Sequence, residues 1–157
     1  MAMTVPTSPS PFVELLDMDR HIEGGWFKEI WKASYQIPHE VLGDRYSGAR
    51  AAASSVYFLL HPGEESAWHK VLSDELWLFH AGGPLELTIG GHGDKPEAAE
   101  TFILGLDIAA GQTPQALVPA GSWQTARPAG DEPVLVTCIV APAFHYDDFS
   151  MIAPDEK

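Results

Sequence analysis

Apolar and polar residues alternate with a period of two along much of this chain, as they do in β-strands that bury one face. Pro84–Ile89 shows this alternation, and Ala53–Leu60 and Val134–Val140 are apolar runs of strand length. Further strands are predicted over Trp26–Lys32, Ser66–Val71, Asp74–His80, Glu100–Leu106, Ala116–Val118 and Trp123–Arg127. Turn residues separate these segments at short intervals, which is typical of an antiparallel sandwich or barrel. The pattern predicts an all-β fold.

A helical period occurs near the N-terminus. Phe12, Leu15 and Leu16 recur at i, i+3 and i+4, and Ser10 precedes them as a candidate N-cap, so a short helix is predicted over Pro11–Met18. Residues 1–10, rich in Pro, Ser and Thr, are expected to form a loosely ordered tail. No internal repeat or linker divides the rest, and we expect one domain over residues 11–157.

Composition agrees with this fold and narrows the partners. The 14 glycines and 13 prolines favour many short strands over long helices. Asp and Glu number 22 against 9 Lys and Arg, which gives a net charge of −13. The basic residues are scattered, so this field would repel nucleic acid and anionic membranes. We therefore expect neither as a partner.

The chain has one cysteine, Cys138, which excludes an internal disulfide and a cysteine-rich zinc site. Since Cys138 lies in an apolar run, its thiol is expected to be buried and inert. Residues 1–10 lack the features of a secretory signal. The longest near-apolar stretch, Val134–Phe144, is far shorter than the ~20 residues of a membrane helix. A cytoplasmic protein is expected.

Candidate chemistry is concentrated in two consecutive predicted strands. The strand period puts Glu75, Trp77 and Phe79 on one face of the second strand, and His69 lies in the first. Their short connection predicts a hairpin, in which His69 and Glu75 would meet across the ladder. An imidazole beside a carboxylate can hold a metal ion or transfer protons.

These residues resemble the first motif of the cupin superfamily, G-x5-H-x-H-x3-E-x6-G. Its positions are matched by Gly63, His69, Glu75 and Gly82, and Val71 stands where the motif has a second histidine. Pro119 and Gly121 resemble the second motif, P-x-G-x2-H, in which Gln124 replaces the histidine. The two motifs occur in the expected order.

Longer phrases resemble the uncharacterised single-domain branch called cupin family five. They include His21–Phe27, Ser66–Lys70, Gly82–Leu87 and Pro142–Phe149. The resemblance implies a double-stranded β-helix, or jelly-roll barrel, with a pocket in the barrel mouth and a homodimeric assembly. It does not imply a settled reaction.

The resemblance first implies a metal hypothesis. His69, Glu75 and Gln124 would ligate a divalent ion, with Mn, Fe, Ni and Zn not distinguishable. Val71 removes one imidazole, and Gln124 offers only a neutral amide oxygen, which weakens the affinity for softer transition metals. The bound molecule would be a small polar or anionic metabolite.

Two further hypotheses need no metal. In one, His69 is a general base oriented by Glu75, as in the sugar-nucleotide epimerase branch of cupins, where a tyrosine is the acid. Tyr57 would supply that acid if its side chain faces inward. With or without a metal ion, the enzyme would be an isomerase, epimerase or lyase acting on a carbohydrate-like substrate. In the other hypothesis, the same pocket binds a small molecule without turnover.

Six residues are candidates for contact with the small-molecule ligand: Glu23, Trp26, Tyr57, Trp77, Phe79 and Gln124. Glu23 and Trp26 either close over the barrel mouth or merely turn the chain from helix to strand. His80 is out of phase with Glu75 and is expected off the inner face. Surface positions are expected for His39, His61, His92, His145 and the pair Asp147–Asp148.

Overall fold

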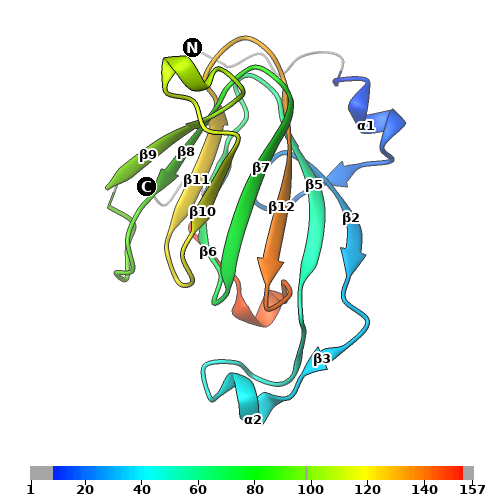
Figure 1. Ribbon diagram of the computed structural model, residues 1–157, viewed down its shortest axis with the longest axis vertical. Coiled ribbons are helices and arrows are strands. Elements are labelled where there is room, and N and C mark those ends of the chain that lie inside the picture. The colour runs from blue at the N-terminus through cyan, green and yellow to red at the C-terminus, as the bar shows by residue number, and fades with distance from the viewer. Residues whose placement is uncertain (1–8, 98, 154–157) are drawn as a thin grey trace.

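Two antiparallel sheets face each other in a computed structural model that describes residues 9–97 and 99–153 (Figure 1). One sheet has six strands in the order β1-β2-β5-β12-β7-β10, and the other has five in the order β13-β6-β11-β8-β9. A separate two-stranded sheet joins β3 to β4. This is the predicted all-β jelly roll with a short N-terminal helix. The predicted tail of residues 1–10 lies outside the described residues except for residues 9 and 10.

The elements in chain order are α1 (Phe12–Leu15), β1 (Asp19–Arg20), β2 (Trp26–Lys32), β3 (Gln36–Ile37), α2 (His39–Leu42), β4 (Arg50–Ala51), β5 (Ser54–Leu60), β6 (Ser66–Lys70), β7 (Asp74–Gly82), β8 (Leu85–Ile89), β9 (Glu100–Leu104), the 3-10 turn η1 (Ile108–Ala110), β10 (Gln115–Val118), β11 (Gln124–Pro128), β12 (Val134–Ala141), the 3-10 turn η2 (Tyr146–Asp148) and β13 (Ser150–Met151). Every strand of the sequence analysis is present, most of them within two residues of the predicted ends. The short strands β1, β3, β4 and β13 were not anticipated.

The predicted hairpin between the strand of His69 and the strand of Glu75 is wrong. β6 pairs with β11 and β13, whereas β7 pairs with β12 and β10. Residues 71–73 carry the chain from one sheet to the other instead of turning it back on itself. His69 and Glu75 therefore lie on facing sheets, and no strand ladder joins them.

The interior divides into an apolar core at one end of the sandwich and a cavity at the other. On β12, Val134 and Val136 belong to the core, and Cys138 and Val140 reach the cavity. The other main core side chains come from both sheets: Leu60, Trp77, Leu85, Leu87, Leu104 and Val118. Burying such side chains is worth about 1.5–3 kcal/mol each and is the main force that holds the two sheets together.

Helix α1 covers the outer face of the six-stranded sheet (Figure 1). It is shorter than predicted, since Asp17 adopts a positive φ of 53° directly after its C-cap. Ser10 accepts a hydrogen bond from the Phe12 N–H through its side chain at 3.3 Å. Beneath the helix, Met18 packs with Leu59 of β5 and Leu135 of β12.

A buried ion pair holds residues 142–149, called the C-terminal segment below, against the sandwich. The Arg50 guanidinium donates to both oxygens of Asp148, from Nε at 2.9 Å and from Nη2 at 2.7 Å. The expectation that Asp148 is a surface residue is therefore wrong, because its carboxylate is the partner of this arginine. His61 is also buried rather than solvated, since its ring contacts Glu64 and accepts from the Ser10 N–H.

None of the described residues belongs to a helix long and apolar enough to cross a membrane.

Gly82 tests how tightly the end of β7 is packed. Its φ is +96°, and an added Cβ would lie 1.8 Å from the Pro133 carbonyl oxygen, so Gly82→Ala must displace the backbone before β12. We expect a loss of at least about 2 kcal/mol in the free energy of unfolding, because positive φ alone costs an L-residue about 1–3 kcal/mol. Chemical denaturation measures it.

Gly130→Ala is the matched control, since nothing lies within 4 Å of its added Cβ. Its effect should stay within about 0.5 kcal/mol. Equal stabilities of the two variants would contradict the close approach at Gly82.

Candidate functional site

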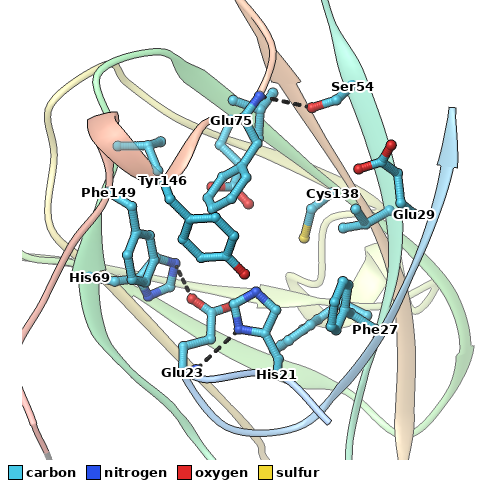
Figure 2. A pocket seen from close by; sticks show the side chains of 15 residues that line it. His21, Glu23, Phe27, Glu29, Ser54, His69, Glu75, Cys138, Tyr146 and Phe149 are labelled. Carbon is cyan, nitrogen blue, oxygen red and sulfur yellow. Dashed lines mark hydrogen bonds and ion pairs between the residues drawn. The ribbon is translucent and has the colours of Figure 1, made fainter. Parts of the chain in front are cut away.

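A cavity of about 210 Å³ occupies the end of the sandwich away from the apolar core (Figure 2). This volume is below the ~300–1,000 Å³ of pockets that hold drug-sized ligands. Polar groups reach the cavity from the turn before β2 and from strands β2, β5, β6 and β7, and aromatic and aliphatic side chains form most of its wall. The lining residues are His21, Glu23, Phe27, Glu29, Ser54, Val56, Phe58, His69, Val71, Glu75, Cys138, Val140, Phe144, Tyr146 and Phe149.

Glu23 reaches the cavity from the tight turn that leads into β2. Gly24 and Gly25 follow it with φ values of +106° and +76°. A Cβ at Gly24 would lie 2.3 Å from the Glu65 carbonyl oxygen, so these glycines let the turn pack on the neighbouring backbone. The Ala67 N–H donates to the Glu23 carbonyl at 2.6 Å and thereby holds the turn against β6.

His69 is held at both ring nitrogens and is 2% exposed. Its Nδ1 lies 2.7 Å from the Ala67 carbonyl oxygen, which can only accept, so Nδ1 carries a proton. Its Nε2 lies 3.0 Å from Glu23 Oε2. The carboxyl group that meets His69 is therefore Glu23, and one proton lies between these two side chains. The predicted partner, Glu75, faces the same cavity from the opposite sheet.

His21 forms a third side of the polar cluster. Its Nδ1 accepts a hydrogen bond from the Glu23 N–H at 3.1 Å, and its ring contacts Phe27 and Phe58 edge to face. His21 begins the stretch His21–Phe27 that carries part of the family resemblance, but it was not among the predicted site residues. The period of two gave no signal for His21, because His21 and Glu23 lie in the turn between β1 and β2 rather than on one strand face.

Glu75 is fixed by a chain of hydrogen bonds that crosses between the sheets. Trp77 Nε1 donates to Gln124 Oε1 at 2.8 Å, and Gln124 Nε2 donates to Glu75 Oε1 at 2.9 Å. An indole N–H can only donate, so the orientation of the Gln124 amide is determined. The Cys138 thiol makes a further hydrogen bond with Glu75.

Burial controls the charges in this cluster. It lowers the pKa of His21 and that of His69 to about 4. Burial also raises the pKa of Glu23 well above its usual value, and the neighbouring Glu75 raises it further. The pKa of Glu75 rises to about 7, again through burial, against the hydrogen bonds from Gln124 and Cys138. Near neutral pH both imidazoles are therefore uncharged and Glu75 titrates, and burial favours the protonated form of Glu23.

Cys138 is buried, as expected, and belongs to the hydrophobic core at the point where the core borders the cavity. Burial and the carboxyl groups of Glu75 and Glu23 raise the pKa of its thiol. The thiol therefore stays protonated and acts as a hydrogen-bond donor.

The donor set does not fit the divalent metal ion of the first hypothesis. Gln124 Oε1 is occupied by the Trp77 indole, and the Gln124 amide turns its N–H groups toward Glu75. Val71 contributes no ligand, and His69 Nε2 faces Glu23. Within residues 9–97 and 99–153, no three His, Cys, Asp or Glu side chains are grouped so that they could hold a metal ion.

Three of the six predicted ligand contacts lie in the cavity wall or directly behind it. Glu23 lines the cavity together with His69 and Glu75, whereas Trp77 and Gln124 lie fully buried behind Glu75. The remaining three are placed elsewhere. Phe79 packs against the apolar core, Trp26 lies in the cluster beneath α1, and Tyr57 faces outward next to Leu16 and His80. Tyr57 therefore cannot act as an acid toward a molecule in the cavity.

Three aromatic residues of the C-terminal segment cover the cavity and were missed as site residues. Phe144, Tyr146 and Phe149 contact one another with ring centroids 5.0–6.1 Å apart, and the Phe149 ring lies 5.8 Å from that of His69. Figure 2 shows the Tyr146 ring reaching toward the middle of the cavity. Their density in a short segment near the end of the chain was the only signal in the sequence.

The chain is similar to several known proteins. It is 23% identical over 166 residues to the uncharacterized protein YML079W of Saccharomyces cerevisiae, covering 98% of this chain and 81% of that one. The solved structure of protein SO0799 from Shewanella oneidensis is 35% identical, with a TM-score of 0.78, over 92% of this chain and 84% of that chain.

A dTDP sugar isomerase from Desulfovibrio desulfuricans shares the fold, with 16% identity and a TM-score of 0.56 over 82% of this chain and 85% of that chain. The family described as "Cupin superfamily (DUF985)" matches residues 10–152. These residues include both motifs, the cavity and the aromatic segment that covers it, and the chain therefore belongs to the Cupin superfamily (DUF985) family.

Proposed function

We propose that the cavity is the site of a metal-independent acid–base reaction on a small molecule, of the isomerase or epimerase class. The observation that carries the proposal is the pair of buried carboxyl groups, Glu23 and Glu75, in one cavity but in different hydrogen-bonding surroundings. Two carboxyl groups whose pKa values differ can take the roles of acid and base.

Glu75 is the base of this proposal. Burial brings its pKa to about 7, so a substantial fraction is ionised near neutral pH, and a base whose pKa lies near the working pH is the most effective. Gln124 and Cys138 are positioning residues, because their hydrogen bonds hold the carboxylate toward the cavity.

The Glu23–His69 pair is the acid. Because Ala67 holds the Nδ1 proton of His69, the proton between Nε2 and Glu23 is the one that remains available. The carboxylate of Glu75 would remove a proton from a carbon next to a substrate carbonyl, and the proton of the pair would pass to the carbonyl oxygen. Return of a proton to carbon, with release of the one on oxygen, completes an isomerisation or epimerisation. Neither step needs a metal ion or an oxidant.

Membership of the cupin family and the fold shared with a sugar isomerase are compatible with this class of reaction. The cavity volume of about 210 Å³ argues for a substrate much smaller than a nucleotide sugar.

Deuterium exchange tests the reaction without knowledge of the product. We expect protein incubated in deuterated water with a set of small carbonyl compounds to replace one C–H by C–D, observed as loss of that proton signal in NMR spectra. Glu75→Gln keeps the shape of the side chain but removes the base, and should slow the exchange by about 10²–10⁴-fold. Glu97→Gln, at an exposed site, is the control.

A chelator should leave the exchange unchanged. Exchange that is lost with chelator and restored by a divalent ion would contradict the metal-free proposal. A compound that saturates the cavity without any exchange would indicate instead a module that binds and does not catalyse.

The raised pKa of Glu75 also predicts how stability depends on pH. A carboxyl group whose pKa is higher in the folded state stabilises the fold at low pH, and this contribution is lost as pH rises through about 7. Between about pH 6.5 and pH 8, Glu75 lowers the free energy of unfolding as pH rises, whereas His21 and His69, whose pKa values burial lowers, raise it. The share of Glu75 is on the order of 1 kcal/mol over this window.

Denaturant unfolding of wild type and Glu75→Gln at several pH values measures this share. With rising pH, the free energy of unfolding of wild type should fall more, or rise less, than that of Glu75→Gln, and Glu97→Gln should follow wild type. Parallel curves for wild type and Glu75→Gln would show that Glu75 is ionised throughout this range.

A further inference from the structure

The side chains around the cavity have an uneven charge distribution. Glu23, Glu75 and Glu29 contribute three carboxyl groups, and none of the described residues that line the cavity is a lysine or an arginine. Arg50, a buried arginine outside the cavity lining, is paired with Asp148. An anionic metabolite, which the sequence analysis allowed, would therefore find no positive partner here.

The two buried carboxyl groups lack a counter-charge. Glu23 is paired with the imidazole of His69, whose uncharged form is favoured by burial, and Glu75 with an amide and a thiol. A carboxyl group buried this deeply has a cationic partner, binds a metal ion or is held in its uncharged form. The protein partners of both carboxyl groups carry no positive charge, so a cationic ligand would add the charge that the protein does not supply.

Aromatic rings line the same cavity as the carboxyl groups. Phe27 of β2 and Phe58 of β5 belong to the six-stranded sheet, and Phe144, Tyr146 and Phe149 belong to the C-terminal segment. Figure 2 shows Phe27, Tyr146 and Phe149 around Glu23. The faces of aromatic rings attract cations, and boxes of such rings are a recurrent way to bind quaternary ammonium groups. Rings and carboxyl groups together favour the same kind of ligand.

We propose that the cavity binds a small organic cation, with an ammonium or similar onium group enclosed by the aromatic rings and facing Glu23 and Glu75. This inference rests on the proposed function only in that both use the cavity as the ligand site. The cation supplies the missing counter-charge and holds Glu75 in its ionised form, which is the form of a base.

The rest of the molecule favours the approach of such a ligand. The net charge of −13 attracts cations over long range, and Glu29 is an exposed carboxylate at the cavity. The volume of about 210 Å³ limits the ligand to a small molecule.

Calorimetric titration with three probes of one shape tests the charge of the ligand. Choline is the cation, 3,3-dimethylbutan-1-ol replaces its nitrogen by carbon, and 3,3-dimethylbutanoate is the anion. We expect choline to bind at least tenfold more tightly than the alcohol, and the anion to bind most weakly. Equal binding of choline and the alcohol, tighter binding of the anion, or no choline binding at millimolar concentration would each overturn the proposal.

Variants separate recognition of the cation from damage to the fold. Tyr146 is 60% exposed, so Tyr146→Leu should fold and reduce the preference for choline over the alcohol severalfold, whereas Tyr146→Phe should keep it. Glu75→Gln should reduce the same preference, and Glu97→Gln should not. A preference unchanged in both Tyr146→Leu and Glu75→Gln would overturn the proposal.

These measurements are independent of catalysis. Choline binding without deuterium exchange would support the cation site and count against the acid–base reaction. Exchange of uncharged carbonyl compounds without a preference for choline would support the acid–base reaction and count against the cation site.

Discussion

The chain of hydrogen bonds from Trp77 through Gln124 to Glu75 determines the character of the site. It joins the six-stranded sheet to the five-stranded sheet at the boundary between the apolar core and the cavity. Because the indole can only donate, the Gln124 amide must offer its N–H groups to Glu75. A position where related motifs have a metal-binding histidine thus serves here to hold a carboxyl group.

Much of the fold follows from local patterns. The period of two located the strands, because a strand with one buried face must alternate along its length. The motif residues also predicted that His69 and Glu75 lie close together, and both side chains line the same cavity. The pairing of their strands could not be predicted, since a three-residue connection can either close a hairpin or cross between layers. Only the packing of the whole sandwich decides between the two.

The partners of the site residues were harder to predict for the same reason. Glu23 meets His69 through a contact between residues 46 positions apart, and nothing in the spacing of either phrase indicates it. Tyr57 lies in a run that is apolar on both faces of its strand, so alternation gave no indication of which way its ring points. The aromatic cover comes from a segment whose place depends on the Arg50–Asp148 ion pair, a contact between residues 98 positions apart.

Because the chain crosses between the two sheets at residues 71–73, the width of the site depends on side chains that do not line it. His69 and Glu75 belong to different layers, and the spacing of facing sheets, about 10 Å, depends on the side chains packed between them. Leu87 and Val136 are among those side chains, and neither touches the cavity. A larger or smaller residue in the apolar core would change the gap between His69 and Glu75 while every group in the cavity stayed the same. The width of the cavity can therefore evolve through substitutions within the core.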